Sequence, residues 1–358
     1  MSWQNMNCPR NDQLVPSDNF ILSDQGPPEV AIPEHYACEI YSPITLDGQE
    51  PVPLPAQVEN DIQQFIAQQN RTATGNVTEL PTSVLARIKS TPSTITVLTY
   101  KRLIIGTMFS LILRCAIDGT EVLSSYTTFL CVNKVMRKKG LAMIMIRCTL
   151  QEGYRRYGIN HGYYMTETVH HDNHSPLTSW YRPLNIKRAR SAGFQIPTFI
   201  LNNKDSRQTR RMTYSIGRPD VLPTPARIDD YSTARKILAT GKFALAPTED
   251  EWSMLCQCFD IYLVQDYGLF FLFPAQLTVQ NTGQKVYLAE LVLMIGDCLS
   301  QVLWIVKDKY DLLYGWCIGD ITGPRVSAAK GINALSNVYL EWYNSHLVAV
   351  ADAKIPVF

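Results

Sequence analysis

Three cations and a glycine stand together at residues 137–140, in a segment that reads Arg137-Lys138-Lys139-Gly140-Leu141-Ala142-Met143. Backbone N–H groups at a helix N-terminus, a glycine that permits close approach and neighbouring cations together suit a pyrophosphate. Such a basic pattern is also common at solvated helix ends, and only its position between a strand and an amphipathic helix favours an anion site. This segment is therefore the first candidate for chemistry in the chain.

The hydrophobic pattern predicts the elements that position this segment. Residues 94–100 alternate, residues 103–116 are rich in strand formers, and a hairpin turn at 117–120 leads into a strand over 121–132. After the basic segment, apolar residues recur at three- and four-residue spacing, which predicts a helix that ends at Gly158. A strand over 161–166 follows.

The second half of the chain repeats this order, with strand 267–279, turn 280–284, strand 286–295, helix 299–309 and strand 312–318. A capping box at Thr248-Glu-Asp-Glu251 predicts a helix before it, and a weaker helix is expected over 56–67. We therefore expect an α+β fold of two related halves, with a mixed central sheet flanked by helices. The expected division is an extended N-terminal arm over 1–45, a first half over 46–205 and a second half over 206–358.

The composition excludes some classes of protein. The chain has 358 residues, 46% of them apolar, and its 33 Lys and Arg nearly balance its 32 Asp and Glu. A net charge of +1 gives no overall field for nucleic acid, so any anion must be met by a local site. No segment has the 18 or more apolar residues of a membrane span, and the start lacks a secretory signal, so a cytoplasmic protein is expected.

Two clusters could suggest a metal, and neither predicts one. A single residue separates Cys256 from Cys258, which is closer than an ordinary zinc pair. His170, His171 and His174 place three imidazoles within five residues, but no second ligand motif stands nearby. No metal is therefore expected.

The segment from Ser125 to Met143 resembles the signature of the glycylpeptide N-myristoyltransferase family, in which a Phe-Leu-Cys-Val-His-Lys strand runs into a basic loop. Within it, Arg137-x-x-Gly140-x-Ala142 has the form of the acyl-CoA loop of the N-acetyltransferase-like superfamily. Tyr164, Trp180-Tyr-Arg182 and Leu184-Asn185 are similar to further family segments at matching spacing. Weaker similarity is found near the two ends of the chain, at Ser2-Trp3-Gln4 and Tyr339-Leu340.

The resemblance implies two acetyltransferase-like halves related by a pseudo-twofold axis. It implies an enzyme that transfers a long-chain acyl group, such as myristoyl, from acyl-CoA to the N-terminal glycine amine of a protein or peptide, without a metal. The residues that it assigns to acyl-CoA are Trp3, Arg137, Lys138, Lys139, Gly140, Leu141, Ala142 and Met143.

The resemblance also implies catalytic roles at three positions. The backbone amides of Phe129 and Leu130 would form an oxyanion hole, and a break in sheet pairing there would free these donors. The terminal carboxylate of Phe358, at the end of the apolar segment Ile355-Pro-Val-Phe358, would be the catalytic base. An apolar C-terminus is also common where a chain simply ends on a core strand.

The acceptor side departs from the family pattern. The positions that correspond to family acceptor residues are Thr128, Met165, Glu167, Ser179, Tyr181 and Asn333. The family's acidic peptide-reading loop is replaced by residues 70–76, which include no carboxylate. Two alternatives therefore stay open: a catalytically inactive relative that acts as a structural or interaction protein, and a short-chain acetyltransferase on the same fold.

Overall fold

The computed structural model of the protein describes residue 27 and residues 29–46, 48–69, 77–79, 82–117, 119–159, 161–166, 174–194, 216–239, 243–279, 282–318 and 333–343. None of the helices in these ranges combines the length and the apolar character that a membrane span needs.

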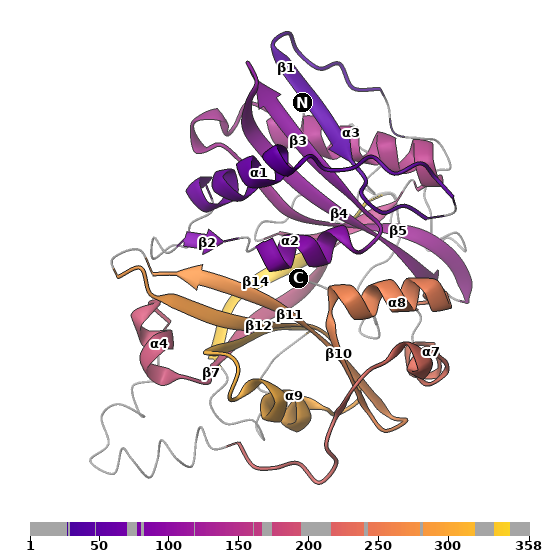
Figure 1. Cartoon of the computed structure of the whole chain (residues 1–358), viewed down its shortest axis with the longest axis vertical. Helices are drawn as coiled ribbons and strands as arrows, with labels where there is room; N and C mark the ends of the chain where they lie inside the picture. Colours follow the sequence, from indigo (N-terminus) through magenta and orange to yellow (C-terminus); the bar gives the residue numbers. More distant parts are fainter. Residues whose placement is uncertain are drawn as a thin grey trace.

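The described chain forms both strands and helices, with runs of consecutive strands in each half (Figure 1). Its strands are β1 (Tyr36–Tyr41), β2 (Val77–Glu79), β3 (Ser93–Tyr100), β4 (Leu103–Ile117), β5 (Thr120–Val132), β6 (Gly162–Thr166), β7 (His174–Pro183), β8 (Thr224–Pro225), β9 (Phe243–Leu245), β10 (Asp260–Val264), β11 (Gly268–Thr278), β12 (Lys285–Ile295), β13 (Leu312–Ile318) and β14 (Asn333–Tyr343). Its helices are α1 (Ala56–Gln69), α2 (Thr82–Lys89), η3 (Lys134–Met136), α3 (Leu141–Tyr157), α4 (Ile186–Ser191), η4 (Ile228–Asp230), α7 (Tyr231–Leu238), α8 (Glu249–Cys258) and α9 (Leu299–Val306).

The strands of the described residues join into one sheet with a symmetric order. The order is β1-β3-β4-β5-β6-β14-β7-β13-β12-β11-β10-β8. On one side β3, β4 and β5 are antiparallel and β6 is parallel to β5, with α3 between the last two strands in sequence. On the other side β10, β11 and β12 are antiparallel and β13 is parallel to β12, with α9 between them. The predicted mixed α+β fold of two related halves is thus confirmed.

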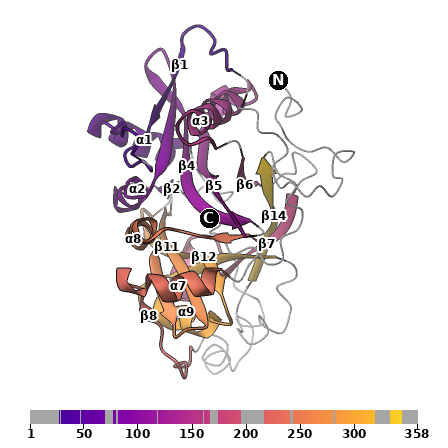
Figure 2. The same cartoon turned by 90° about the vertical axis from the view of Figure 1, so that its right-hand side faces the viewer.

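The two halves exchange a strand at the centre of the sheet. Strand β7 follows β6 in the chain but pairs with β13, and β14 follows β13 but pairs with β6. The two exchanged strands also pair with each other, which Figure 2 shows in the neighbouring ribbons of β6, β14 and β7. Each half therefore completes the sheet of the other.

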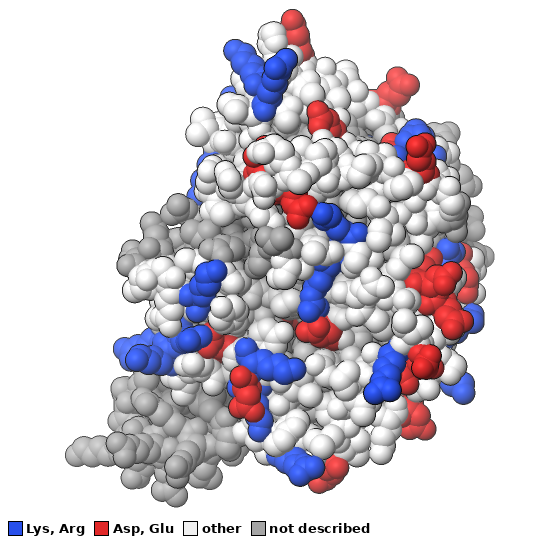
Figure 3. Space-filling model, viewed as in Figure 1, with Lys and Arg blue, Asp and Glu red and all other residues white. Residues whose placement is uncertain are grey.

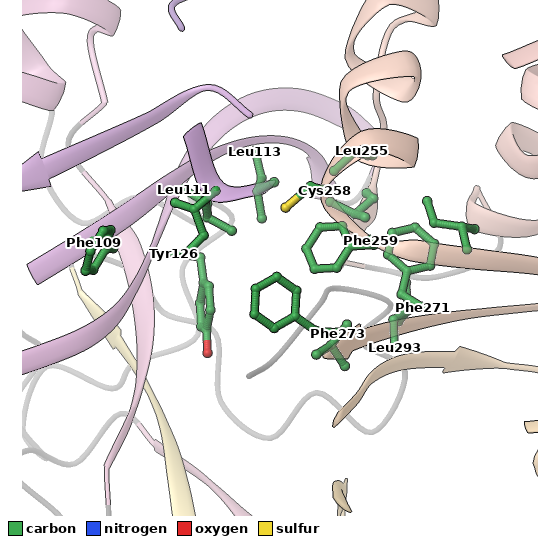
Figure 4. Close-up of a cluster of buried hydrophobic side chains, with 14 of the residues drawn as sticks. Phe109, Leu111, Leu113, Tyr126, Leu255, Cys258, Phe259, Phe271, Phe273 and Leu293 are labelled. Atoms are coloured by element: carbon green, nitrogen blue, oxygen red, sulfur yellow. The ribbon is translucent and has the colours of Figure 1, made fainter. Parts of the chain in front are cut away.

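Four apolar clusters fix the helices on the two faces of the sheet. The largest contains Phe109, Leu111 and Tyr126 from the first half with Phe271 and Phe273 from the second, so the halves share one core (Figure 4). Helices α1, α2, α7 and α8 add side chains to this cluster. Helix α3 packs on β3 and β4 in a second cluster, α9 on β11 to β13 in a third, and α4 on β12 and β13 in a fourth.

Ion pairs also cross between the halves, and two of them involve helices α2 and α8. Arg114 on β4 donates from Nε to both carboxylate oxygens of Glu251 on α8, at 3.1 Å each. Arg87 on α2 contacts Asp260 on β10 at 2.9 Å between Nη1 and Oδ1. Both pairs are at least half-buried, and they align the helices of one half with those of the other.

Most elements around the basic segment agree with the predictions. Strands β3, β4, β5, β6, β11, β12 and β13 and helices α1, α3, α8 and α9 lie where the pattern placed them, within a few residues at their ends. The capping box at Thr248 is present, and Gly158 ends α3 in the left-handed conformation.

Other elements were not predicted. Strand β1 lies inside the expected extended arm, where it pairs with β3, and the rest of that arm lies mainly outside the described residues. The pattern also missed α2, α4, α7, β7, β10 and β14. The expected boundary at residue 205 falls outside the described residues and stays a prediction.

Candidate functional site

A bulge interrupts β5 at the residues that the sequence assigns to the oxyanion hole. Phe109 on β4 faces Thr128 and Thr107 faces Cys131, so Met108 alone stands opposite both Phe129 and Leu130. The extra residue is accommodated because Phe129 adopts a left-handed φ of 50°. Phe129 and Leu130 therefore lie outside the regular ladder with β4.

The neighbouring strand on the other side also leaves β5 at this point. Parallel pairing between β5 and β6 ends at Thr127 and Tyr164, although β5 continues to Val132 and β6 to Thr166. The two strands diverge where the bulge begins. Neither neighbour pairs in register with Phe129 or Leu130, which is the arrangement that leaves peptide groups for a ligand.

The side chains at the bulge point in opposite directions. The Phe129 ring packs edge-on against Phe109, with the ring centroids 5.6 Å apart, and joins the shared core. The Leu130 side chain is 43% exposed. An exposed leucine beside diverging strands offers an apolar contact to a ligand that enters there.

The segment between β5 and α3 is held by its own hydrogen bonds. The Asn133 side chain accepts from the Val135 backbone N–H at 3.0 Å and so begins η3. The Asn133 backbone N–H in turn donates to the Ile105 carbonyl at 2.8 Å. Arg137 Nε donates to the Val132 carbonyl at 3.2 Å, which ties the end of η3 back to the end of β5.

Two residues in the left-handed conformation precede α3 and set the direction in which the helix begins. Lys138 has φ 63° and Gly140 has φ 76°, and α3 begins directly after Gly140 without a side-chain cap. The first backbone N–H groups of a helix have no partner within the helix, and its macrodipole is positive at this end. Arg137, Lys138 and Lys139 are exposed beside it, and the first turn carries no acid. The structure thus brings cations, a glycine and helix N–H groups together.

Helix α3 can lie this close to β4 because of a glycine. A Cβ atom added at Gly106 on β4 would come within 2.5 Å of the Met145 sulfur on α3. Leu141 is buried in the cluster under α3, Met143 is also buried, and Ala142 is half-buried. Of the residues assigned to acyl-CoA, Leu141 and Met143 therefore anchor the loop through their side chains.

The predicted acceptor residues fall into two groups in the structure. Thr128 lies just before the bulge on β5, and Met165 lies on β6 and packs against the shared core. Ser179 and Tyr181 lie on β7 and are 0% and 3% exposed, and Tyr181 stands opposite Asn333 of β14. Trp3, Glu167 and Phe358 lie outside the described residues, and so do His170 and His171.

The second half also has a strand with an extra residue whose parallel pairing ends beside it, but the helix start that follows carries no cations. Strand β12 carries an extra residue, Val292, and its pairing with β13 ends at Leu291 and Gly315. The turn before α9 contains Gly296 and Asp297 where the first half has three cations. The Trp180 ring lies against Gly315, where an added Cβ would be 2.6 Å from it, so this side of the second half is packed. Of the two equivalent turns, the one before α3 therefore suits an anion better.

Two residues beside the acceptor positions were not predicted from the sequence. Glu290 on β12 faces Tyr314 on β13, and Tyr314 faces Tyr181. Burial raises the pKa of the Glu290 carboxyl to about 7. A single carboxylate within the apolar run Leu288 to Leu293 was the signal that could have drawn attention to it.

The comparisons with known proteins concern the fold. No protein-family model matches the chain, and no curated protein matches its sequence significantly. Crystal structures of Saccharomyces cerevisiae N-myristoyltransferase with bound myristoyl-CoA match it with TM-scores of 0.76 and 0.75, at 12% and 13% identity. These matches cover 97% and 98% of this chain and 92% and 91% of the yeast chain.

A third structure of the yeast enzyme, with bound myristoyl-CoA and inhibitors, matches with a TM-score of 0.74 at 12% identity, over 99% of this chain and 93% of that chain. The likeness extends over both halves and the exchanged strands between them. The chain therefore has the fold of N-myristoyltransferase, with two related halves around one mixed sheet, at 12% to 13% sequence identity to the yeast enzyme.

Proposed function

We propose that this protein is an acyl-CoA-dependent N-acyltransferase that transfers a long-chain acyl group to an N-terminal amine. The observation that carries the proposal is the bulge at Phe129 and Leu130, where the register with β4 is interrupted and the pairing with β6 has already ended, shortly before a basic helix start. The same fold in yeast N-myristoyltransferase, in structures with bound myristoyl-CoA, supports it.

The basic segment would hold the CoA pyrophosphate. Arg137, Lys138 and Lys139 supply charge, and the N-terminus of α3 after Gly140 supplies backbone N–H groups. Residues 141–143 lie within the first turn of α3, and Trp3 would cover the ligand from the arm. The thioester would then lie at the diverging ends of β5 and β6, with the acyl chain beside the exposed Leu130.

The chemistry requires one bond to form and one to break. The amine nitrogen attacks the thioester carbonyl, and the amides of Phe129 and Leu130 stabilise the oxyanion that develops. The C–S bond then breaks, the new amide remains on the acceptor, and CoA leaves as its thiol after taking up a proton. The Phe358 carboxylate would remove the proton from the incoming ammonium, whose ordinary pKa near 8 makes this step modest.

The acceptor would be a protein or peptide with an N-terminal glycine. Thr128, Met165, Glu167, Ser179, Tyr181 and Asn333 are the proposed acceptor positions. We propose a cytoplasmic location, where acyl-CoA is available as co-substrate, and no metal or nucleic acid takes part.

An acyl-CoA titration tests the binding site. Replacing Lys138 and Lys139 together with Glu is expected to weaken acyl-CoA binding at least tenfold, because both charges reverse beside the pyrophosphate. The matched control reverses two other exposed lysines, Lys236 and Lys285, and is expected to leave affinity unchanged. Equal losses in both double variants would show that the basic segment holds no ligand.

Chain extension tests the base. Adding a few residues after Phe358 moves the terminal carboxylate, and turnover is expected to fall while acyl-CoA affinity stays the same. A series of acyl-CoAs of graded length, from acetyl to palmitoyl, measures the depth of the channel in the same assay. Unchanged turnover in the extended chain contradicts the proposed base, and a preference for acetyl-CoA identifies a short-chain enzyme.

One observation favours a second candidate function. Ser179 and Tyr181, two of the proposed acceptor positions, are almost fully buried, as core residues are. A relative that binds acyl-CoA or a protein partner without catalysis would tolerate such packing. Acyl-CoA binding without turnover on any amine acceptor would identify it.

A further inference from the structure

A row of facing residues crosses the second half of the sheet and ends at the proposed acceptor positions. Phe273 on β11 faces Glu290 on β12, Glu290 faces Tyr314 on β13, and Tyr314 faces Tyr181 on β7. Directly opposed residues on neighbouring strands place their side chains on the same face of a sheet. Glu290 and Tyr314 therefore share a face with the acceptor residue Tyr181.

The surroundings of Glu290 are apolar. Two residues away on the same strand, Leu288 and Val292 are buried, and Phe273 opposite is 1% exposed. These residues belong to two clusters, the shared core and the cluster under α4, and Glu290 lies where the clusters meet. Among the described residues of the row, the hydroxyls of Tyr314 and Tyr181 are the other titratable groups.

Other carboxylates in the interior have partners. Glu251 is contacted by Arg114, and Asp311 accepts from Arg188 at 3.2 Å and from the Tyr287 backbone N–H at 3.0 Å. No hydrogen bond or ion pair to Glu290 is found within the described part of the chain, and its side chain is only half-buried. A carboxylate in apolar surroundings without a partner is costly in free energy unless a cation arrives or a proton is taken up.

We propose that the Glu290 carboxylate binds a cationic group of the acceptor. The row carries this inference because it extends the proposed acceptor positions Tyr181 and Asn333 to a carboxylate that has no cation partner among the described residues. The inference rests on the proposed function, since it names the chemistry of the substrate at that same site. It would give a chain whose residues 70–76 include no carboxylate a different group for contact with a basic acceptor.

The cation has two possible sources in a peptide acceptor, its α-ammonium and a lysine side chain. One carboxylate can hold either group through charge-assisted hydrogen bonds. Peptides that start with glycine and carry either lysine or N-acetyllysine differ only in the side-chain charge. They separate the two sources without a change of length.

Peptide binding measured by calorimetry in the presence of acyl-CoA tests the inference. Glu290→Gln keeps the shape and removes the charge, and it is expected to weaken binding of the lysine peptide about tenfold. If Glu290 binds the lysine side chain, the acetyllysine peptide is expected to bind the wild type and Glu290→Gln equally. If Glu290 binds the α-ammonium, both peptides are expected to bind Glu290→Gln more weakly than the wild type. The control Glu121→Gln alters an exposed carboxylate on β5 and is expected to change neither.

The measurement also varies pH and acyl-CoA. The advantage of the wild type over Glu290→Gln is expected to grow between pH 6 and pH 8, as the carboxyl ionises. Equal peptide affinities in the two proteins, or no peptide binding by either, would overturn the inference. Acyl-CoA binding by the wild type is titrated separately. A lack of acyl-CoA binding would contradict the proposed function, whereas the peptide affinities test the role of Glu290.

Discussion

At the scale of single residues, Phe129 shows how a local cost serves the site. A non-glycine residue with φ near 50° costs roughly 1–2 kcal/mol relative to an ordinary strand conformation. The edge-on contact with Phe109 and burial against the shared core offset that cost. The strained residue is also the one that takes β5 out of its ladder, so the bulge and the proposed oxyanion hole have the same origin.

Paired substitutions at Phe129 measure this strain. Phe129→Ala and Phe129→Gly both remove the ring, but only glycine adopts a positive φ freely. Phe129→Gly is therefore expected to be more stable than Phe129→Ala by about 1 kcal/mol, the reverse of the usual order in a strand. Urea unfolding of both variants measures the difference. A Phe129→Ala variant more stable than Phe129→Gly would mean that the bulge relaxes when the ring is lost.

Glu290 predicts a pH dependence of stability at the same scale. Burial raises its pKa from an ordinary 4.5 to about 7, so the folded state disfavours the ionised form. The cost is absent below the unfolded pKa and grows as pH rises through 7. Without a peptide, Glu290→Gln is expected to gain up to about 2 kcal/mol on the wild type between pH 5 and pH 8. Unfolding curves at the two pH values measure it, and parallel curves contradict it.

At the scale of elements, the start of α3 decides where an anion can bind. Gly140 is left-handed and nothing lies within 4 Å of a Cβ added to it, so a short polar side chain fits there. The equivalent turn before α9 has Asp297 and no cation. The two turns also differ in backbone conformation, because the N-cap Gly140 of α3 is left-handed whereas the N-cap Cys298 of α9 has a φ of −109°.

Two substitutions at Gly140 separate charge from conformation. Asn and Asp are similar in size, and both tolerate a positive φ better than other side chains. Gly140→Asp is expected to bind acyl-CoA at least fivefold more weakly than Gly140→Asn, since it places a negative charge at the helix N-terminus. Tryptophan fluorescence titration compares the two. Equal affinities would place the phosphates elsewhere.

At the scale of the whole molecule, the exchanged strands make the halves interdependent. Strand β14 lies between β6 and β7, so removing it exposes two strand edges at the centre of the sheet. The shared core takes Phe109 from one half and Phe271 from the other (Figure 4). On the face seen in Figure 3, Lys and Arg alternate with Asp and Glu, which agrees with a balanced net charge and a local anion site.

A fragment of residues 1–194 tests this interdependence. It retains β1 to β7 but lacks β14 and the second half of the shared core. The fragment is expected to be unfolded or aggregated, whereas the full chain unfolds in one cooperative transition. Near-ultraviolet circular dichroism and size-exclusion chromatography distinguish these states. A soluble fragment with native-like dichroism would show that the halves are independent domains.

The sequence by itself determined the local features of this protein. Hairpin turns, helix caps and period-dependent apolar patterns placed the strands and helices around residues 94–166, 248–258 and 267–318, because these signals depend on residues close in the chain. The basic segment before α3 was readable for the same reason.

Only the tertiary structure decided the features that depend on distant residues. Strands β1, β7 and β14 carry little local pattern, and their pairing is fixed by neighbours far away in sequence. The exchange of β7 and β14 between the halves is therefore invisible in the sequence. In the sequence, Glu290 is a single carboxylate in an apolar run. Only the register of the sheet places it in line with Tyr314 and Tyr181.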